Sequence, residues 1–156
     1  MIDKTDPETW TKSFVSSNQT LCLQILREVN SLVLKGLSQK DYRAAAVCLD
    51  RLLSGLAIMH SANCGNFFSY LSIYSVCIAT ISAFGLDMPE HKRRDMVLAG
   101  LEDALDFSTS KETTEYVTAM IADLKSGMSF PRLQQKYSPK FPQDEISLIK
   151  DLGSKL

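Results

Sequence analysis

Histidine and cysteine are the side chains of this 156-residue chain best suited to acid–base, metal or nucleophilic chemistry. His60 lies on the apolar side of a predicted helix, just before a polar turn at 63–66. A general base there would need a carboxylate or a nucleophile within hydrogen-bonding reach, whereas the neighbouring sequence supplies serines and asparagines. We therefore interpret His60 as a histidine satisfied at a helix end, and keep a pocket beside it as an alternative. His91, beside three cations in the first turn of a helix, is interpreted as solvated.

The four cysteines, Cys22, Cys48, Cys64 and Cys77, include no pair at the spacing of a zinc site. Three of them fall within predicted helices, where cysteine is usually a small buried hydrophobe in a reducing compartment. Cys64, next to Gly65 in a turn, is the one whose exposure would make a thiol reactive. The spacings of hydrolases, metalloproteases, phosphate loops and calcium loops are absent, as are the paired Glu-x-x-His ligands of a di-iron bundle. We therefore expect no catalytic residue, no metal and no cofactor.

Two tyrosines one helical turn apart, Tyr70 and Tyr74, are candidate anchors for a partner. Tyrosine supplies a large contact area with few rotatable bonds, which makes it common at the centre of protein interfaces. The same pair would also serve as core packing. Tyr70, Tyr74 and His60 are therefore the candidate interaction residues.

His60, Tyr70 and Tyr74 lie in one long uncharged stretch, since no Asp, Glu, Lys or Arg occurs between Arg51 and Asp87. Such a stretch is buried either in protein or in lipid. Serines, a threonine and two internal tyrosines dilute its apolar part at 67–84, so we expect burial by other helices and no membrane span. One side of this helix is bulky and the other is small, which would let a second helix approach closely. We expect it to be the central helix.

Apolar residues recur at helical period through nearly the whole chain, and no stretch alternates at period two. Asp6-Pro7-Glu8 has the residue order of a helix start and predicts a short helix that carries Trp10 and Phe14. The other predicted helices span about 20–35, ended by Gly36; from Ser38 or Asp41 to His60; 67–84; 90–107; 113 to Gly127; and two short segments in the proline-containing tail.

The segment 40–53 resembles the second helix of a tetratricopeptide repeat, and a similar spacing recurs at 97–105. It matches that family at Tyr42, Ala45 and Leu49 and departs from it at Leu52, where the family has a small residue. The signature of the first helix of the repeat is missing. Over residues 20–107 the resemblance implies a stack of helical hairpins. The fold class that we expect is all-α, with six to eight helices in antiparallel hairpins that form a bundle or a short tetratricopeptide-like solenoid.

The segment 124–137 resembles the turn and second helix of small helix-turn-helix modules, with Ser129 as a cap and Leu133 facing its partner. Arg132 and Lys136 would supply positive charge for nucleic acid, and acidic residues further along the tail offset it. A C-terminal helical tail that packs on the domain is the interpretation that we favour.

The length suits one domain, which we divide into a helical core at 1–127 and a helical tail at 128–156 packing on it. The net charge of −1 argues against bulk attraction to nucleic acid or to anionic membranes. No secretory signal pattern begins the chain, so we expect a cytoplasmic protein. The expected function is a non-enzymatic protein–protein interaction or adaptor module, whose partner is a protein, a peptide or a second copy. The alternatives are a regulator that binds nucleic acid through the tail, and a helical-bundle enzyme or small-ligand binder with a pocket near His60.

Overall fold

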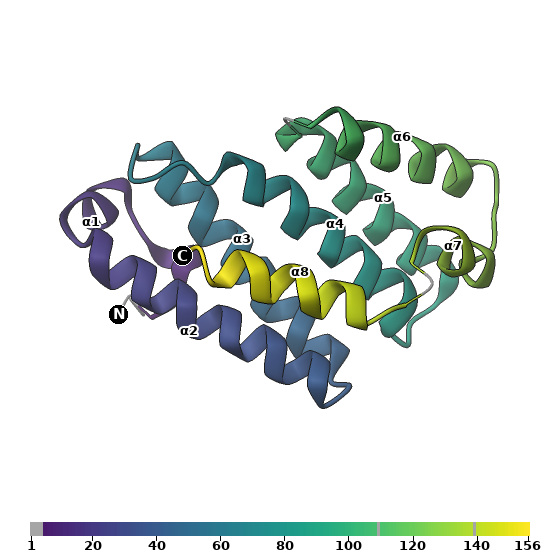
Figure 1. The fold of residues 1–156 in the computed structure, drawn as a ribbon, viewed down its shortest axis with the longest axis horizontal. Coiled ribbons are helices and arrows are strands. Elements are labelled where there is room, and N and C mark those ends of the chain that lie inside the picture. Colours follow the sequence, from purple (N-terminus) through teal and green to yellow (C-terminus); the bar gives the residue numbers. More distant parts are fainter. Residues whose placement is uncertain (1–4, 109, 139) are drawn as a thin grey trace.

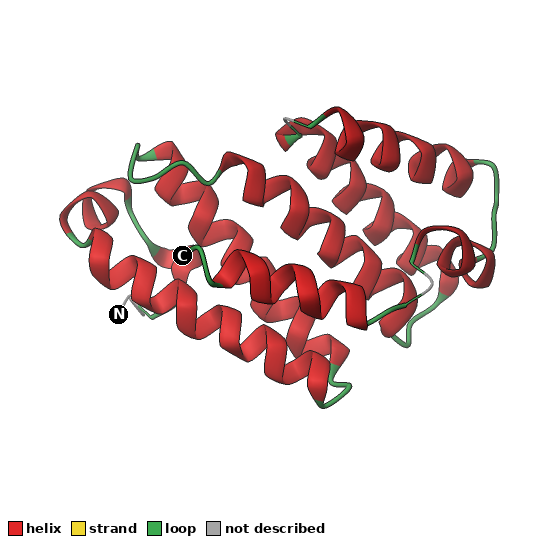
Figure 2. Ribbon diagram, viewed as in Figure 1, coloured by secondary structure: helices red, strands yellow, loops and turns green. Residues whose placement is uncertain are grey.

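The computed structural model describes residues 5–108, 110–138 and 140–156, and these residues form helices without a strand (Figure 1, Figure 2). The predicted all-α class with six to eight helices is therefore confirmed. In chain order the elements are η1 (Pro7–Thr9), α1 (Lys12–Ser17), α2 (Gln19–Ser38), α3 (Tyr42–Ser61), α4 (Phe68–Gly85), α5 (Glu90–Phe107), α6 (Lys111–Lys125), α7 (Phe130–Tyr137) and α8 (Gln143–Gly153).

Polar side chains begin several of these helices. A side-chain oxygen accepts a hydrogen bond from a first-turn backbone N–H at Asp6, Thr11, Asp41, Ser110 and Ser129. Each of these bonds satisfies a donor that has no partner within its own helix. The predicted starts at Asp6, Asp41 and Ser129 are thereby confirmed.

Two predicted boundaries are wrong. Gly36 lies inside α2, which continues to Ser38. A Cβ on Gly36 would lie 3.0 Å from the Ala45 backbone nitrogen, so the missing side chain lets α2 and α3 approach closely and does not end the helix. The N-terminal segment forms η1 and α1 in place of one helix, and Trp10 is buried between them.

Helix α4 is the central helix, as the uncharged stretch predicts, and it contacts α3, α5, α6, α7 and α8 (Figure 1). It joins two hydrophobic clusters. Larger side chains such as Leu71 and Tyr74 belong to a cluster with α1, α2, α3 and α8. The small side chains Ala79 and Ala83 belong to a second cluster with α5, α6 and α7. Burial on both sides explains why α4 carries no formal charge.

The small face of α4 packs closely against α5. The Ser72 hydroxyl donates a 3.0 Å hydrogen bond to the Ala104 carbonyl of α5. A Cβ built on Gly100 of α5 would lie 3.4 Å from the Ala79 Cβ. Small residues therefore meet on both helices, which confirms the predicted close approach.

The C-terminal helix α8 returns to the beginning of the chain and packs on α2 and α4 (Figure 1). Asn30 of α2 links the three helices, because its amide donates to the Ile149 carbonyl at 3.4 Å and accepts from the Tyr74 hydroxyl at 3.1 Å. Between α7 and α8 the link is polar, because the Ser138 hydroxyl at the end of α7 donates a 3.1 Å hydrogen bond to Glu145 in the first turn of α8. The third helix of the predicted helix-turn-helix arrangement therefore packs on α2 and α4 and not along the second.

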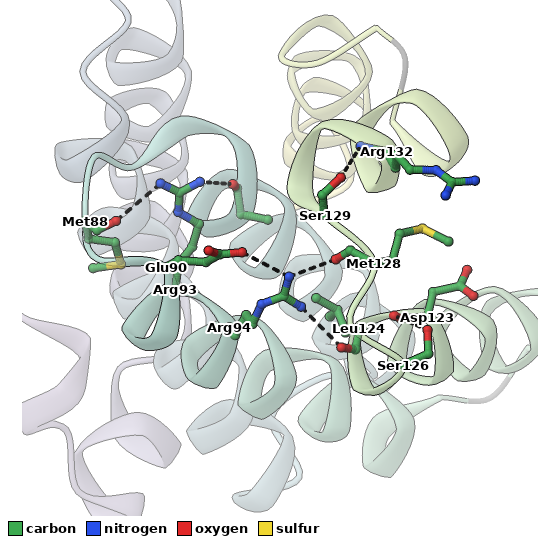
Figure 3. Close-up of polar contacts among 11 residues, drawn as sticks. Met88, Glu90, Arg93, Arg94, Asp123, Leu124, Ser126, Met128, Ser129 and Arg132 are labelled. Atoms are coloured by element: carbon green, nitrogen blue, oxygen red, sulfur yellow. Dashed lines mark hydrogen bonds and ion pairs between the residues drawn. The ribbon is translucent and has the colours of Figure 1, made fainter.

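Arg93 and Arg94 hold the α6–α7 turn and the α4–α5 linker against the first turn of α5 (Figure 3). The Arg94 guanidinium donates to the Leu124 carbonyl at 3.2 Å and to the Met128 carbonyl at 2.9 Å. Both guanidinium groups lie over the Phe130 ring, at 4.9 and 5.1 Å from its centroid. Arg93 and Arg94 are therefore held by backbone carbonyls and an aromatic ring, although the sequence places them in a cluster of cations.

Among the described helices, α3 is the one whose length and apolar composition would suit a membrane span, and core helices of globular proteins share that property. Helix α4, for which the sequence predicts burial by other helices and no membrane span, is apolar over a shorter length.

Candidate functional site

A groove of about 870 Å³ lies between α3 and α5, with the C-terminal half of α4 beneath it. It forms because α3 and α5 both pack on α4 and do not contact one another. We call it the α3–α5 groove. It is lined by Glu8, Lys40, Asp41, Tyr42, Arg43, Ala46, Val47, Asp50, Arg51, Ile78, Ser82, Gly85, Leu86, Asp87, Met88, Pro89, Lys92 and Met96.

The α3 wall of the groove begins at the Asp41 cap. The Asp41 carboxylate accepts a 3.2 Å hydrogen bond from the Ala44 N–H, which sets the first turn and the rotation of α3. Tyr42 packs against Gly85 at the end of α4, where a Cβ would lie 2.8 Å from the tyrosine ring. This glycine therefore closes the end of the groove tightly. Residues one and two turns further along α3 continue the wall.

The opposite wall consists of the first turns of α5 and the linker 86–89. Arg93 positions this linker, because its guanidinium donates to the Ala83 and Met88 carbonyls, each at 3.3 Å (Figure 3). The same turn of α5 then presents Lys92 and, one turn on, Met96 to the groove. The contacts of Arg93 thus fix the rotation of α5 that places Lys92 and Met96 in the groove.

Two large apolar side chains in the groove are exposed to solvent. Val47 of α3 is 52% exposed and Met96 of α5 is 42% exposed. Between them, Ile78 and Ser82 of α4 line the groove. The centre of the groove is therefore apolar and its borders are charged.

Charges of both signs border the groove and separate along it. Lys40, Arg43 and the capping Asp41 stand at the beginning of α3, and Glu8, Asp50 and Arg51 line the part further along that helix, so each end carries a single net charge of opposite sign. Partial desolvation and the neighbouring Asp50 carboxyl raise the pKa of Glu8. One end of the groove therefore favours an acidic group and the other a basic one.

The structure places the predicted interaction residues outside this groove. His60 is half-buried in the last turn of α3 and lines no pocket found among the described residues. Tyr74 is fully buried and donates to Asn30, so it is a core residue. Tyr70 is half-buried, with its ring 5.8 Å from that of Phe67. None of the three lines the α3–α5 groove.

The predicted nucleic-acid residues, Arg132 and Lys136, are exposed on α7. The Lys136 ammonium forms a 2.7 Å ion pair with Asp123 of α6, which neutralises part of the local positive charge. No contact of these residues tests binding to nucleic acid, which stays a prediction.

The cysteines are all free thiols, and Cys22, Cys64 and Cys77 are buried. Burial raises the pKa of Cys22, Cys48 and Cys77, which disfavours the reactive thiolate. Cys64, the predicted reactive candidate, donates a weak 3.4 Å hydrogen bond to the Ala62 carbonyl. No group of three potential metal ligands occurs among the described residues.

Sequence reasoning missed Val47 and Met96. Both are apolar residues that lie off the buried stripe of their helix, and Val47 stands among charged residues on the solvent face of α3. A lone apolar residue on a polar face is common, so this signal becomes meaningful only when two helices bring such residues to one groove.

Comparison of the chain with protein-family models, with curated proteins and with solved structures finds no match.

Proposed function

We propose that this chain is a non-enzymatic interaction module that binds an amphipathic helix of a partner protein in the α3–α5 groove. The observation that carries the proposal is the pair of exposed apolar side chains, Val47 and Met96, on either side of one groove. Helix-in-groove recognition uses such apolar anchors for affinity and the surrounding charges for selectivity.

The length of the groove supports a helical occupant. From Tyr42 to Arg51 the α3 wall runs about 13 Å, at ~1.5 Å per residue, which matches two to three turns of a bound helix. Val47 and Met96 are each about half exposed. Covering each of them would contribute roughly half of the ~1.5–3 kcal/mol that full burial of such a side chain supplies. The two contacts together contribute roughly 1.5–3 kcal/mol, so we expect a short peptide to bind weakly, with a Kd nearer to millimolar than to micromolar.

The charges of the groove support one orientation of that helix. An acidic residue of the occupant would lie near Lys40 and Arg43, and a basic residue near Glu8 and Asp50. Acidic residues are favoured in the first turn of a helix and basic residues in its last turn. The occupant would thus run in the same direction as α3.

Two predictions from the sequence, the tetratricopeptide-like stacking and the cytoplasmic setting, would suit this proposed function. A tetratricopeptide-like stacking of the hairpins over residues 20–107 would suit a module that captures a partner helix between two of its own. A cytoplasmic setting would agree with four cysteines that form no disulfide among the described residues.

Fluorescence anisotropy with designed helical peptides of about 14 residues tests this function. The first peptide carries leucines on one face, glutamate in its first turn and lysine in its last, and the second has the two charges exchanged. We expect the first peptide to bind at least about tenfold more tightly, a difference of ~1.4 kcal/mol. Equal binding of the two peptides, or binding that survives replacement of the leucines by serine, would contradict the proposal.

Self-association is measured in parallel by sedimentation of the chain alone. Association that depends on concentration and disappears in Val47→Glu would assign the groove to a second copy. That result would overturn the assignment to a partner helix.

A further inference from the structure

Helix α8 lies beside α2 and α4 at the surface of the stack (Figure 1). Among the described helices it packs on these two, and the contacts that join α3, α4, α5 and α6 to one another do not involve it. Its inner side chains Ile149, Leu152 and Leu156 are buried, whereas Ser147 and Lys150 are exposed. The helix can therefore leave its seat on α2 and α4 while the other helices stay packed on one another.

The linker that enters α8 is anchored by an aromatic cluster. The centroid of the Phe141 ring lies 5.4 Å from that of Tyr42 at the start of α3 and 6.1 Å from that of Phe84 near the end of α4. Ring pairs at such distances attract one another. Phe141 therefore fixes the point at which the chain turns into α8, and a motion of α8 would take place beyond this residue.

Two polar contacts that hold α8 on α2 do not depend on pH. The Arg27 guanidinium of α2 donates to the Leu156 carbonyl, and the Asn30 amide donates to the Ile149 carbonyl at 3.4 Å. An arginine side chain stays protonated in proteins, and an amide does not titrate. A dependence of docking on pH must therefore come from another group.

Glu145, in the first turn of α8, is a titratable group that docking buries. Only 5% of its surface is exposed, and one carboxyl oxygen accepts a 3.1 Å hydrogen bond from the Ser138 hydroxyl. The other oxygen, Oε2, is buried and makes no hydrogen bond with any residue that the structure describes. An ionised carboxylate in this position loses hydration that the protein does not replace, whereas the neutral acid loses much less.

The groups around Glu145 supply no positive charge. The other titratable side chains that line the small cavity beside it are those of Cys77 on α4, Glu112 and Tyr116 on α6, Tyr137 at the end of α7 and Asp144 on α8. Each of them is either neutral or negative. Lys35 in the last turn of α2 and Lys140 of the linker are exposed and do not line this cavity. The neighbours of Glu145 therefore oppose its ionisation, as burial does.

We propose that α8 is a pH-sensitive strap, which docks on α2 and α4 while Glu145 is protonated and moves away from them, about the Phe141 anchor, when Glu145 is ionised. Undocking carries the carboxylate into water, where its charge is hydrated. The same motion breaks the bond between Asn30 and Ile149 and uncovers the surface of α2 and α4 beneath α8. No residue of α2 or α8 lines the α3–α5 groove, so this proposal is independent of the proposed function.

The direction of the pH effect follows from the environment of Glu145. Burial raises the pKa of this carboxyl, and hydrogen bonds from its own backbone N–H and from Ser138 oppose that rise only in part. In the undocked helix the carboxyl is hydrated and regains its ordinary pKa of 4.5. Docking is therefore strongest below pH 4.5 and weakens as pH rises through the docked-state pKa. Hydrated first-turn acids act in the opposite direction, because their ionisation stabilises a helix.

Amide hydrogen exchange followed by NMR tests the proposal on the whole chain. We expect the protection factors of α8 to be lower than those of α3 and insensitive to urea below the unfolding transition, as for a local opening. They should fall at least about tenfold, or ~1.4 kcal/mol, between pH 4.5 and pH 8. Exchange of α8 with the protection and urea dependence of α3 would show that α8 leaves only on global unfolding, which overturns the proposal. Protection of α8 that stays constant or rises with pH would also overturn it.

A matched pair of variants assigns the effect to Glu145. Glu145→Gln keeps the shape of the side chain and cannot ionise, so the protection of α8 should no longer depend on pH and should exceed that of wild type at least about tenfold at pH 8. Asp144→Asn removes the exposed acid of the same turn and should keep most of the fall with pH. If the pH dependence survives in Glu145→Gln, or disappears in Asp144→Asn, Glu145 is not the group that controls docking.

A third variant tests the proposal even if Glu145→Gln fails to fold. Ser138→Ala removes the side-chain donor to the Glu145 carboxyl and leaves the acid itself in place. A hydrogen bond to an ionised acceptor is stronger than one to the neutral acid, so its loss destabilises the docked helix more at high pH. We therefore expect the protection of α8 to fall more steeply with pH than in wild type. A fall that is equal or shallower in Ser138→Ala would overturn the proposal.

Discussion

Val47 of α3 and Met96 of α5 line the same groove although their two helices do not contact one another. The central helix α4 separates them and lies beneath the groove with Ile78 and Ser82. The groove is thus a direct result of using α4 as the centre of the stack. Two helices packed on a third leave a channel where their own side chains do not meet.

Charged substitutions in the groove should change binding without changing stability. Val47→Glu and Met96→Glu replace exposed side chains, so we expect the free energy of unfolding to stay within about 0.5 kcal/mol of wild type. Each should weaken binding of the designed leucine-faced peptide at least about tenfold, because a carboxylate then occupies the apolar contact. Leu32→Glu on the outer face of α2, equally exposed, is the control and should bind the peptide normally. A loss of binding in the control would show that the peptide recognises apolar surface in general.

Two glycine-to-alanine variants should change the free energy of unfolding in opposite directions. In Gly85→Ala the new Cβ would lie 2.8 Å from the Tyr42 ring, so the end of the groove must open and the protein should be destabilised. In Gly100→Ala the nearest atom is the Ala79 Cβ at 3.4 Å, an ordinary contact. This variant should gain about 0.5–1 kcal/mol from improved helix propensity. Urea unfolding followed by circular dichroism measures both changes, and a stabilised Gly85→Ala would contradict the described packing of Tyr42.

Arg94→Ala should destabilise the protein and loosen the α6–α7 turn. The guanidinium donates to the Leu124 and Met128 carbonyls, and a buried hydrogen bond to a charged group has a net contribution of about 1.5–3 kcal/mol, which partial exposure of Arg94 reduces. We expect a loss of about 1–3 kcal/mol and faster amide exchange at 125–130. Arg94→Lys should recover little of the lost stability, because an ammonium lacks the planar fork with which a guanidinium donates to two carbonyls. Lys92→Ala, in the same turn but exposed, should leave the free energy of unfolding unchanged. A comparable loss in Lys92→Ala would mean that the positive charge, and not the hydrogen bonds of Arg94, stabilises the turn.

The stability of the ligand-free protein should fall with rising pH through the titration of Glu145. Burial raises the pKa of this carboxyl from its ordinary value of 4.5, so the folded state holds a proton that the unfolded state has already lost. The contribution of Glu145 is therefore fully present below pH 4.5 and is lost as pH rises through the folded-state pKa. The neighbouring Tyr116 and Cys77 stay neutral over this range, because their pKa values are also raised, and Asp144 is exposed.

Glu145→Gln removes this titration. We expect the variant to match wild type below pH 4.5 and to be more stable by about 1 kcal/mol at pH 8, a typical cost of a buried group without a partner. Denaturation curves across this pH range make the comparison, with Glu102→Gln as the exposed control. A wild-type protein that gains stability relative to Glu145→Gln as pH rises would contradict the described environment of this carboxyl.

The architecture could be predicted from the sequence where a pattern depends on one element alone. The uncharged stretch and its bulky and small faces predict α4 as a central helix with a close neighbour, and Ser72, Gly100 and Ala104 realise that contact. The prediction at Gly36 is wrong because glycine has two uses. It ends helices, and it also permits close packing within them, and only the position of α3 decides between these uses.

The candidate sites could not be predicted from the sequence, because each is formed by side chains from several helices and a sequence pattern describes one helix at a time. Val47 and Met96 matter only because α3 and α5 are both placed beside α4. Glu145 reads as an ordinary first-turn acid, and its burial follows from the return of α8 onto α2 and α4. The tyrosine pair illustrates the converse, since Tyr74 has the composition of an anchor and lies in the core, bonded to Asn30.

Methyl-group NMR during titration with the leucine-faced peptide tests helix binding in the α3–α5 groove, because Val47 and Met96 report from opposite sides of the groove. We expect the methyl signals of Val47 and Met96 to shift together and to saturate with the same Kd. The signals of the exposed control residues Leu21 and Leu32 on α2 should not move. Shifts confined to α2, or a Val47 signal that moves while the Met96 signal does not, would contradict a helix bound between α3 and α5.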